Sequence, residues 1–229
     1  MKARKAIREV FIRGSNRLFG TELTHRSKIA HGLMEIFNKT EQLLNPNWRV
    51  QQKFERENPN VPWFVPDSIK YIEQIIQPHY VGWEWGSGRS SIWFAERVKQ
   101  HYCVEGRRAW YNQMTIQISE QNLEDKIHLQ LAEVTSEYEF DLQEVERYAA
   151  TIDVMNDGSL DYVIVDGHFR LECLKHCLPK IRGGGYLIID NSDLHTLRAF
   201  YANLEFAEKR VFSNGLWETT IITALPDGF

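Results

Sequence analysis

Hydrophobic residues follow two different patterns along the 229-residue chain. Up to residue 60 they recur at helical spacing, as at Leu33, Ile36 and Phe37. From residue 61 onward, short apolar runs alternate with amphipathic stretches, which is the pattern of a parallel sheet covered by helices on both faces. The sequence therefore predicts an N-terminal helical extension or lid over residues 1–60 and an α/β domain over residues 61–229.

The apolar runs of the α/β domain have the length and composition of buried strands. Five of them lie at residues 81–85, 102–105, 127–131, 162–165 and 186–189. Two more runs, 207–212 and 217–224, flank Ser213-Asn214-Gly215, a turn sequence that suits a β-hairpin. The last two strands are therefore expected to be antiparallel to each other.

Amphipathic stretches predict helices before, between and after these strands. Their expected positions are 67–76, 91–99, 108–122, 171–181 and 197–204. Asp67, directly after Pro66, is expected to be the N-cap of the first of these helices. Residues 183–185 are three glycines and are expected to end the fourth. Residues 133–158 are acidic and show no clear pattern of either kind.

The composition is that of a globular protein with a buried core, because 43% of the residues are hydrophobic and 25% are charged. The longest apolar runs last only a few residues, far short of the ~20 that a membrane-spanning helix needs. No apolar stretch follows the basic residues at the start, so we expect no secretory signal and a cytoplasmic protein. The three cysteines, Cys103, Cys173 and Cys177, are expected to be reduced core residues.

Charge is unevenly distributed along the chain. The net charge of −4 argues against a general nucleic-acid binder, so a nucleic-acid partner is not expected. Residues 1–30 carry eight Lys or Arg and two Glu, a net charge of 8 − 2 = +6, which leaves −10 for the remainder. We expect this basic region to be the solvated face of a helix, and an anionic partner or a membrane surface is the alternative.

A glycine-rich segment, Glu84-Trp85-Gly86-Ser87-Gly88, joins the first predicted strand to the next helix. Glycines at this point let backbone N–H groups approach a ligand, and the helix N-terminus adds partial positive charge. Glu105 ends the next strand, 105 − 84 = 21 residues after Glu84, where a carboxylate can accept both hydroxyls of a ribose. A tight turn beside an unrelated surface Glu is the simpler alternative. Glu84 would repel a pyrophosphate and would favour a cationic ligand.

Two further polar segments follow the fourth and fifth predicted strands, Asp166-Gly167-His168-Phe169-Arg170 and Asp190-Asn191-Ser192-Asp193. Open α/β sheets place their ligands at these carboxyl ends. His168 titrates near neutral pH and is the candidate general base, with Asp166 orienting it or binding the acceptor. The alternatives are a loop histidine without a catalytic task and, for Arg170, a pairing either with Asp166 or with a substrate anion.

Taken in order, these segments resemble the motifs of the class I S-adenosylmethionine-dependent methyltransferases. The segments that carry the resemblance are Glu84–Gly88, Glu105, Asp161–Gly167 and Gly183–Asn191. The resemblance spans residues 61–229. It implies a Rossmann-like, doubly wound sheet of seven strands to which the terminal hairpin adds an antiparallel strand.

The resemblance also implies how the residues would contact S-adenosylmethionine. Gly86, Ser87 and Gly88 would line the methionine part of the cofactor, and Glu84 would lie near its ammonium group. Glu105 would hold the ribose.

The adenine end of the implied site is less sharply marked. Gly106 and Trp110 would border the adenine, although a helix aromatic in the core is the alternative for Trp110. Ala132 and Glu133 occupy the usual position of the adenine edge without matching a motif. Ser90 stands where many members of the family have a third glycine.

Asp166, Asp190 and Asn191 resemble the Mg²⁺ ligands of the catechol O-methyltransferase group. In that group a lysine-bearing pattern follows the first Asp, whereas this chain has His168-Phe169-Arg170 there. A magnesium site is therefore an alternative that the pattern favours less than a metal-free enzyme.

The expected function is that of an S-adenosylmethionine-dependent methyltransferase that methylates an oxygen, and less so a nitrogen, of a small molecule, a glycan-like compound or a natural product. His168 and Asp166 would be the catalytic residues. The alternative is a catalytically inactive module that keeps the fold and acts through the basic region on an anionic partner. A nicotinamide oxidoreductase is a third and weaker interpretation, because Glu84 suits a dinucleotide phosphate poorly.

Overall fold

The computed structural model describes residues 45–135 and 141–229. The basic region and the apolar positions Leu33, Ile36 and Phe37 lie outside the described residues, so the helices expected there stay predictions. None of the described helices has the length and apolar character that a bilayer crossing requires.

The chain divides into two compact units, residues 1–56 and residues 57–229. In the first unit, helix α3 (Pro46–Glu57) begins after Asn45, whose side-chain oxygen accepts a hydrogen bond from the N–H of Asn47 at 3.1 Å. The described strands all belong to the second unit.

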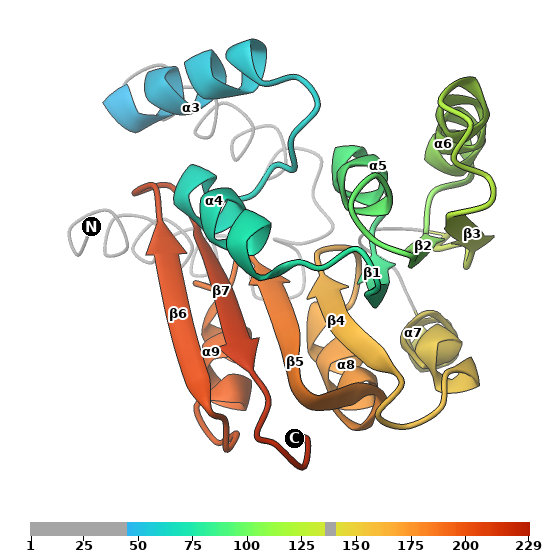
Figure 1. The fold of residues 1–229 in the computed structure, drawn as a ribbon, viewed down its shortest axis with the longest axis vertical. Helices are drawn as coiled ribbons and strands as arrows, with labels where there is room; N and C mark the ends of the chain where they lie inside the picture. Colours follow the sequence, from blue (N-terminus) through green and yellow to red (C-terminus); the bar gives the residue numbers. More distant parts are fainter. Residues whose placement is uncertain (1–44, 136–140) are drawn as a thin grey trace, which may run out of the picture. The chain divides into compact units, whose positions relative to one another are not determined.

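A seven-stranded sheet forms the centre of the second unit (Figure 1). Its strands are, in chain order, β1 (Val81–Trp85), β2 (Gln100–Glu105), β3 (Ile127–Leu131), β4 (Leu160–Val165), β5 (Ile181–Asp190), β6 (Glu208–Ser213) and β7 (Glu218–Thr223). In space their order is β3-β2-β1-β4-β5-β7-β6. Strands β1 to β5 pair in parallel, and β7 is antiparallel to both of its neighbours. The predicted doubly wound sheet with a terminal hairpin is confirmed.

The chain changes its direction across the sheet between β1 and β4. Strands β2 and β3 follow outward on one side of β1, whereas β4 and β5 lie on its other side. In open α/β sheets such a reversal leaves a crevice at the carboxyl ends of the two central strands, and ligands bind there. The residues that follow β1 and β4 are therefore the first candidates for a site.

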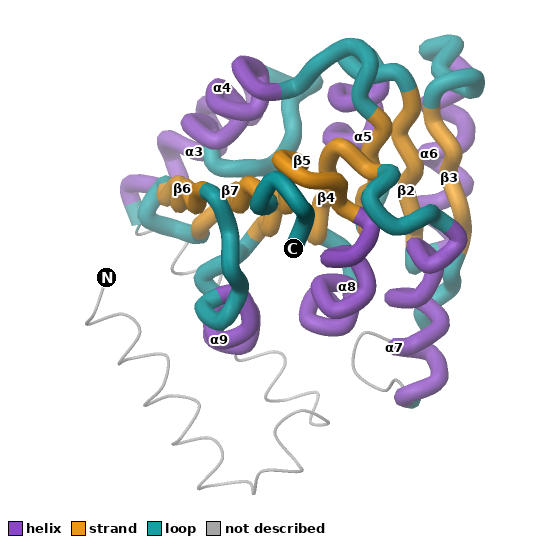
Figure 2. The backbone as a smooth tube through the Cα atoms, turned by 60° about the horizontal axis from the view of Figure 1, so that its bottom comes forward, coloured by secondary structure: helices purple, strands orange, loops and turns teal. Residues whose placement is uncertain are grey.

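Helices cover both faces of the sheet (Figure 2). They are α4 (Pro66–Ile75), α5 (Arg89–Ala95), α6 (Arg108–Glu120), α7 (Leu142–Ala149), α8 (Arg170–Cys177) and α9 (His195–Tyr201), with short 3-10 helices over Ala150–Val154 and Leu178–Lys180. Figure 2 shows α7, α8 and α9 on one face and α4 and α5 on the other.

Each face of the sheet has its own hydrophobic core. Against α7, α8 and α9 pack strand residues such as Trp85, Val163 and Leu187, together with the expected core cysteines Cys173 and Cys177. On the α5 and α6 side the core includes Ile92, Cys103, Met114 and Ile118. Both faces of the central strands are thus buried, which is why their sequences are apolar almost throughout.

The N-cap prediction for α4 is wrong. The capping position is Val65, and Pro66 is the first helical residue, a position where its missing N–H costs nothing. Asp67 lies in the first turn instead, where its carboxylate pairs with Lys70 at 2.9 Å.

The three glycines at 183–185 do not end a helix, because they belong to β5. The preceding helix is already over at Cys177 and is followed by a 3-10 turn. A Cβ on Gly183 would lie 1.8 Å from the carbonyl oxygen of Pro226, so the glycine permits a close backbone approach. Gly184 has a φ of +69°, which also favours glycine.

Candidate active site

The loop between β1 and α5 holds the glycines of the predicted cofactor site. Gly86 has a φ of +91°, and a Cβ there would lie 2.9 Å from the nitrogen of Gly167 in the loop after β4. Its N–H donates to the carbonyl of Val104 in β2 at 2.8 Å. A Cβ on Gly88 would meet nothing within 4 Å. The loop is therefore tightly packed at Gly86 and open at Gly88.

Glu105, the last residue of β2, lies directly against this loop and is 3% exposed. Its carboxylate accepts hydrogen bonds from the N–H and the hydroxyl of Ser87, at 3.2 and 2.9 Å, and from the N–H of Arg107 at 2.7 Å. The Nε of Arg107 lies 4.0 Å away on an exposed side chain. The structure thus brings Glu105 and the glycine loop together and satisfies the carboxylate with neutral donors.

Glu84 lies beneath the loop, fully buried on the sheet face that α5 covers. Its carboxylate accepts a hydrogen bond from the hydroxyl of Ser91 and lies 3.0 Å from the Nε2 of His101. Ser91 in turn accepts a hydrogen bond from the N–H of Gly88 at 3.1 Å. The other carboxylate oxygen of Glu84 has no hydrogen-bond partner among the described residues. Glu84 therefore supports the loop from below through Ser91.

His168 packs against the residue that follows Glu105. A Cβ on Gly106 would lie 2.6 Å from the Cδ2 of His168, so the imidazole covers Gly106 closely. The ring also makes an edge contact with Tyr148 of α7, at 5.8 Å between centroids. This placement puts His168 on the side where the resemblance expects the adenine.

The other residues that the resemblance places near the cofactor make different contacts. Trp110 donates its indole N–H to the carbonyl of Ser87 at 2.7 Å, so it fixes the glycine loop. The N–H of Ala132 donates to the carbonyl of Glu105 at 2.9 Å, and Glu133 pairs with Arg108 at 2.7 Å. Ser90 is buried within α5.

Asp166, Asp190 and Asn191 are brought together by the parallel pairing of β4 and β5, but they surround a guanidinium group. Arg170 donates to Asp166 at 2.8 Å, to the side-chain oxygen of Asn191 at 3.1 Å, and to the main-chain carbonyl of Asp190. Its Nε donates to the carbonyl of Gly167 at 3.2 Å. The pairing of Arg170 with Asp166 is therefore the alternative that the structure supports.

The side chain of Asp190 is buried and accepts a hydrogen bond from the hydroxyl of Thr219 in β7 at 3.0 Å. Burial, and next the negative charge of Asp166, raise the pKa of Asp190 to about 8, while Arg170 opposes the rise. Asp190 is therefore harder to ionise than an exposed aspartate.

No protein-family model and no curated protein matches this sequence. Solved structures do match it. A methyltransferase from Geobacter sulfurreducens has a TM-score of 0.52 and 15% identity over 84% of this chain and 96% of that chain. An rRNA methylase from Streptococcus thermophilus has a TM-score of 0.51 and 12% identity over 69% and 95%. A Streptococcus mutans protein assigned as a methyltransferase, in complex with SAH, has a TM-score of 0.51 and 12% identity over 67% and 94%.

The chain has the class I methyltransferase fold. In this methyltransferase fold, a cavity of about 450 Å³ lies beside the loop after β4. Gly167, Phe169 and Arg170 line it from that loop and from the start of α8, and apolar side chains from α7 and α9, Val145 and Leu197 among them, form its other walls. The cavity therefore borders the cluster around Arg170.

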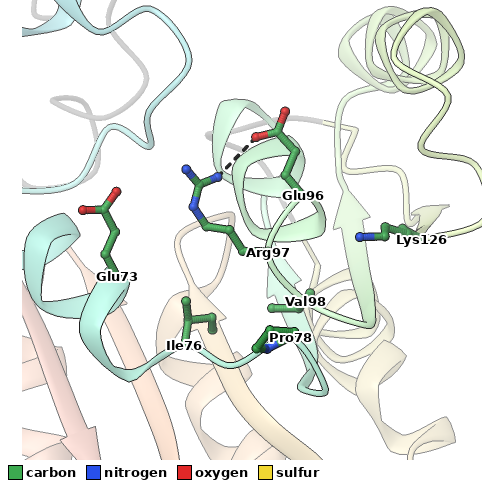
Figure 3. Close-up of a pocket in the computed structure, with 7 residues that line it drawn as sticks. All are labelled: Glu73, Ile76, Pro78, Glu96, Arg97, Val98 and Lys126. Atoms are coloured by element: carbon green, nitrogen blue, oxygen red, sulfur yellow. Dashed lines mark hydrogen bonds and ion pairs between the residues drawn. The ribbon is translucent and has the colours of Figure 1, made fainter.

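A second cavity, of about 510 Å³, lies at the opposite edge of the methyltransferase fold (Figure 3). It is lined by Pro78, Val98 and Lys126, which precede β1, β2 and β3, and by the exposed Glu96–Arg97 pair that Figure 3 shows. Because it lies at the amino ends of the strands, it is separate from the glycine loop and from Glu105.

Sequence reasoning missed three residues that shape the site: Ser91, His101 and Tyr148. His101 and Glu84 occupy paired strands, and the period-two alternation of β1 puts Glu84 on the face opposite Trp85. That alternation is a signal that could have placed Glu84 under α5. No comparable signal marks Tyr148, because its contact with His168 joins segments 20 residues apart, from 148 to 168.

Proposed function

We propose that the protein is an enzyme that transfers a methyl group from S-adenosylmethionine to a small acceptor. The observation that carries the proposal is the hydrogen-bonded contact between Glu105 and Ser87 of the glycine loop, at the reversal point of a methyltransferase fold. When bound, the cofactor supplies an already activated methyl group. The protein then has to hold the two reactants in line and to accept a proton.

The residues at this edge suit the cofactor. The open space at Gly88 lets the methionine part approach the backbone, and Glu105 offers carboxylate oxygens to the ribose hydroxyls. Hydrogen bonds to a charged acceptor contribute about 1.5–3 kcal/mol each, and a ribose hydroxyl makes a bond of the same kind, so it can replace the contact with Ser87. His168, lying on Gly106, offers a flat ring to the adenine. Glu84 keeps the loop in place through Ser91.

The cavity beside Arg170 suits a small, uncharged acceptor with a hydroxyl group. Its walls are largely apolar, with Val145, Phe169 and Leu197 among them. The positive charge of Arg170 is neutralised by Asp166, so the cavity offers no strong attraction to a phosphate or a carboxylate. We therefore place the acceptor in this cavity and expect methylation on oxygen.

We assign acceptance of the proton to Asp166 and a cofactor contact to His168. The carboxylate side chain of Asp166 is 34% exposed, and its neighbour Gly167 lines the cavity, whereas the ring of His168 is turned to Gly106. Asp166→Asn should lower kcat by about 10² to 10⁴-fold. His168→Ala should mainly raise the KM for S-adenosylmethionine. The opposite result, with kcat lost in His168→Ala at an unchanged KM, would restore His168 as the base.

Titration calorimetry with S-adenosylhomocysteine tests the cofactor assignment. Glu105→Ala should weaken binding by about 1.5–3 kcal/mol, because a charge-assisted acceptor is lost. Glu73→Ala is the matched control, since Glu73 is an exposed carboxylate at the cavity on the opposite edge, and it should bind like the native protein. Absence of binding to the native protein would refute the proposal.

A module that keeps the fold without the activity is the second candidate. Two contacts favour it. Protein donors already occupy both oxygens of Glu105, and His168 already covers Gly106. The same titration separates the two candidates, because this module would bind no S-adenosylhomocysteine.

The class of acceptor needs its own assay, because two of the similar solved structures, from Clostridium thermocellum and Streptococcus thermophilus, are assigned as rRNA methylases. Transfer of a radioactive methyl group can be followed to phenols, sugars and aliphatic alcohols on one side and to purified ribosomal RNA on the other. Methylation of a small hydroxyl compound would support the proposal. Methylation of RNA alone would refute the small acceptor and leave the methyl transfer intact.

A further inference from the structure

The guanidinium group of Arg170 lies among oxygen atoms at the ends of β4 and β5. Phe169, directly before it, has a φ of +50°, and this turn starts α8 at Arg170. The guanidinium group then donates to four oxygens: a carboxylate oxygen of Asp166, the amide oxygen of Asn191, and the carbonyls of Asp190 and Gly167. The Arg170 side chain is 19% exposed.

Carboxylate, amide and carbonyl oxygens are the ligands that Mg²⁺ and Mn²⁺ prefer, and these ions bring their ligands to about 2.0–2.2 Å around one point. Here the guanidinium lies between the oxygens, and it carries positive charge like the ion. A divalent cation therefore does not fit among Asp166, Asp190 and Asn191 while Arg170 is in place.

We infer that Arg170 is a built-in cation, which holds the ends of β4 and β5 together where these oxygens would otherwise need a divalent ion. The native protein then binds no divalent ion at this edge. Removal of the guanidinium leaves the carboxylate of Asp166 without a counter-charge and the amide oxygen of Asn191 and the main-chain carbonyl of Asp190 without their donor, which turns the cluster into a divalent-cation site. The inference concerns ion binding, so it does not depend on the proposed methyl transfer.

Binding of Mn²⁺ to the full chain, followed by electron paramagnetic resonance and by thermal melting, tests this inference. Native protein should show no binding at this edge, and Arg170→Met should bind Mn²⁺ at least about 100-fold more tightly. At about 100 times its Kd, Mn²⁺ should raise the melting temperature of Arg170→Met by roughly 5 °C. Asp166→Asn in the Arg170→Met background should abolish both effects.

Two control variants separate this role from ordinary structural support. Arg170→Lys keeps a cation and should stay insensitive to Mn²⁺. Arg182→Met removes another arginine that pairs with an aspartate, Asp161, at 2.7 Å near the other end of β4, and it should gain no response to Mn²⁺. Tight Mn²⁺ binding by the native protein that Asp166→Asn abolishes would overturn the inference, as would an Arg170→Met variant that folds and binds no more Mn²⁺ than native. If Arg170→Met does not fold, tight Mn²⁺ binding by the native protein or by Arg170→Lys would still overturn the inference.

Discussion

Two carboxylates at the same edge of the sheet have different kinds of partner. Glu105, at the end of β2, accepts hydrogen bonds from uncharged donors, the N–H and hydroxyl of Ser87 and the N–H of Arg107. Asp166, after β4, is paired with the guanidinium of Arg170 at 2.8 Å. The first carboxylate belongs to the proposed cofactor half of the site and the second to the acceptor half.

The difference between the two halves lies in how easily their contacts can be replaced. A hydrogen bond to a carboxylate contributes about 1.5–3 kcal/mol, and a ligand hydroxyl that replaces the donor makes a bond of the same kind, so the exchange costs little. Removing one partner of a buried ion pair costs about 3–5 kcal/mol, because the other charge is left without compensation. In the proposed site, ligand groups can therefore replace the partners of Glu105, whereas the ion pair between Asp166 and Arg170 stays in place.

Arg170→Met should give the largest loss of stability. Because Asp166 is partly exposed, we expect the free energy of unfolding to fall by about 2–4 kcal/mol, somewhat less than for a fully buried pair. Urea denaturation measures the loss. Arg182→Met removes a more exposed arginine and should cost less, because Asp161 keeps a hydrogen bond from the N–H of Val81 at 2.7 Å. Equal losses in the two variants would contradict the contrast.

Gly86→Ala should come next, with a loss of about 2 kcal/mol, because an L residue at φ +91° is strained and its Cβ would crowd the backbone of Gly167. Gly88→Ala is the matched control. Its Cβ would meet nothing within 4 Å, so less than about 0.5 kcal/mol should be lost. Thermal and urea unfolding of the two variants, measured side by side, check this prediction.

The pH dependence of stability should reveal Asp190. With its pKa raised to about 8, Asp190 is protonated in the folded state over a range in which the unfolded chain has already released the proton. The free energy of unfolding should therefore fall as the pH rises from about 4 to about 8, by at most about 1.4 kcal/mol per pH unit from this group. Asp190→Asn cannot ionise and should flatten the slope. An unchanged slope in urea titrations at pH 5, 6, 7 and 8 would refute the shift.

Glu105→Gln should give the smallest loss of stability, about 1 kcal/mol, because the amide keeps one acceptor oxygen for the donors around it. Its effect on S-adenosylhomocysteine affinity should exceed its effect on unfolding, if Glu105 exchanges its protein partners for a ligand. Calorimetry and urea denaturation on the same preparation give both numbers. A loss confined to stability would make Glu105 a purely structural residue.

Except for β5, which begins five residues before the expected start at residue 186, the strands could be predicted from the sequence within about two residues, because most of them form short apolar runs. Helix α7 could not, although Val145, Tyr148 and Ala149 do form a buried helical stripe. Its stripe is short and lies in a segment rich in acidic residues. The prediction for residues 183–185 failed because their glycines serve the approach of Pro226, a contact between distant parts of the chain.

The candidate site was predictable only in part. The sequence predicted that Glu105 and the glycine loop lie together, since both stand at the carboxyl ends of neighbouring strands, and the structure shows this contact. It left the partner of Arg170 open, because the register of β4 against β5 decides which oxygens reach the guanidinium. It placed Glu84 beside a ligand, whereas the structure places this carboxylate under α5 with Ser91 and His101.

The position of β7 between β5 and β6 has a consequence for the order in which the sheet assembles during synthesis. Strand β6 leaves the ribosome first, but its neighbour in the finished sheet is β7, which is made after it. Until β7 emerges and pairs with β5, β6 has no edge to join, and the hydrogen-bonding edge of β5 is open to other chains. The interval between synthesis of β5 and synthesis of β7 is therefore one in which the nascent protein exposes a strand edge that favours aggregation.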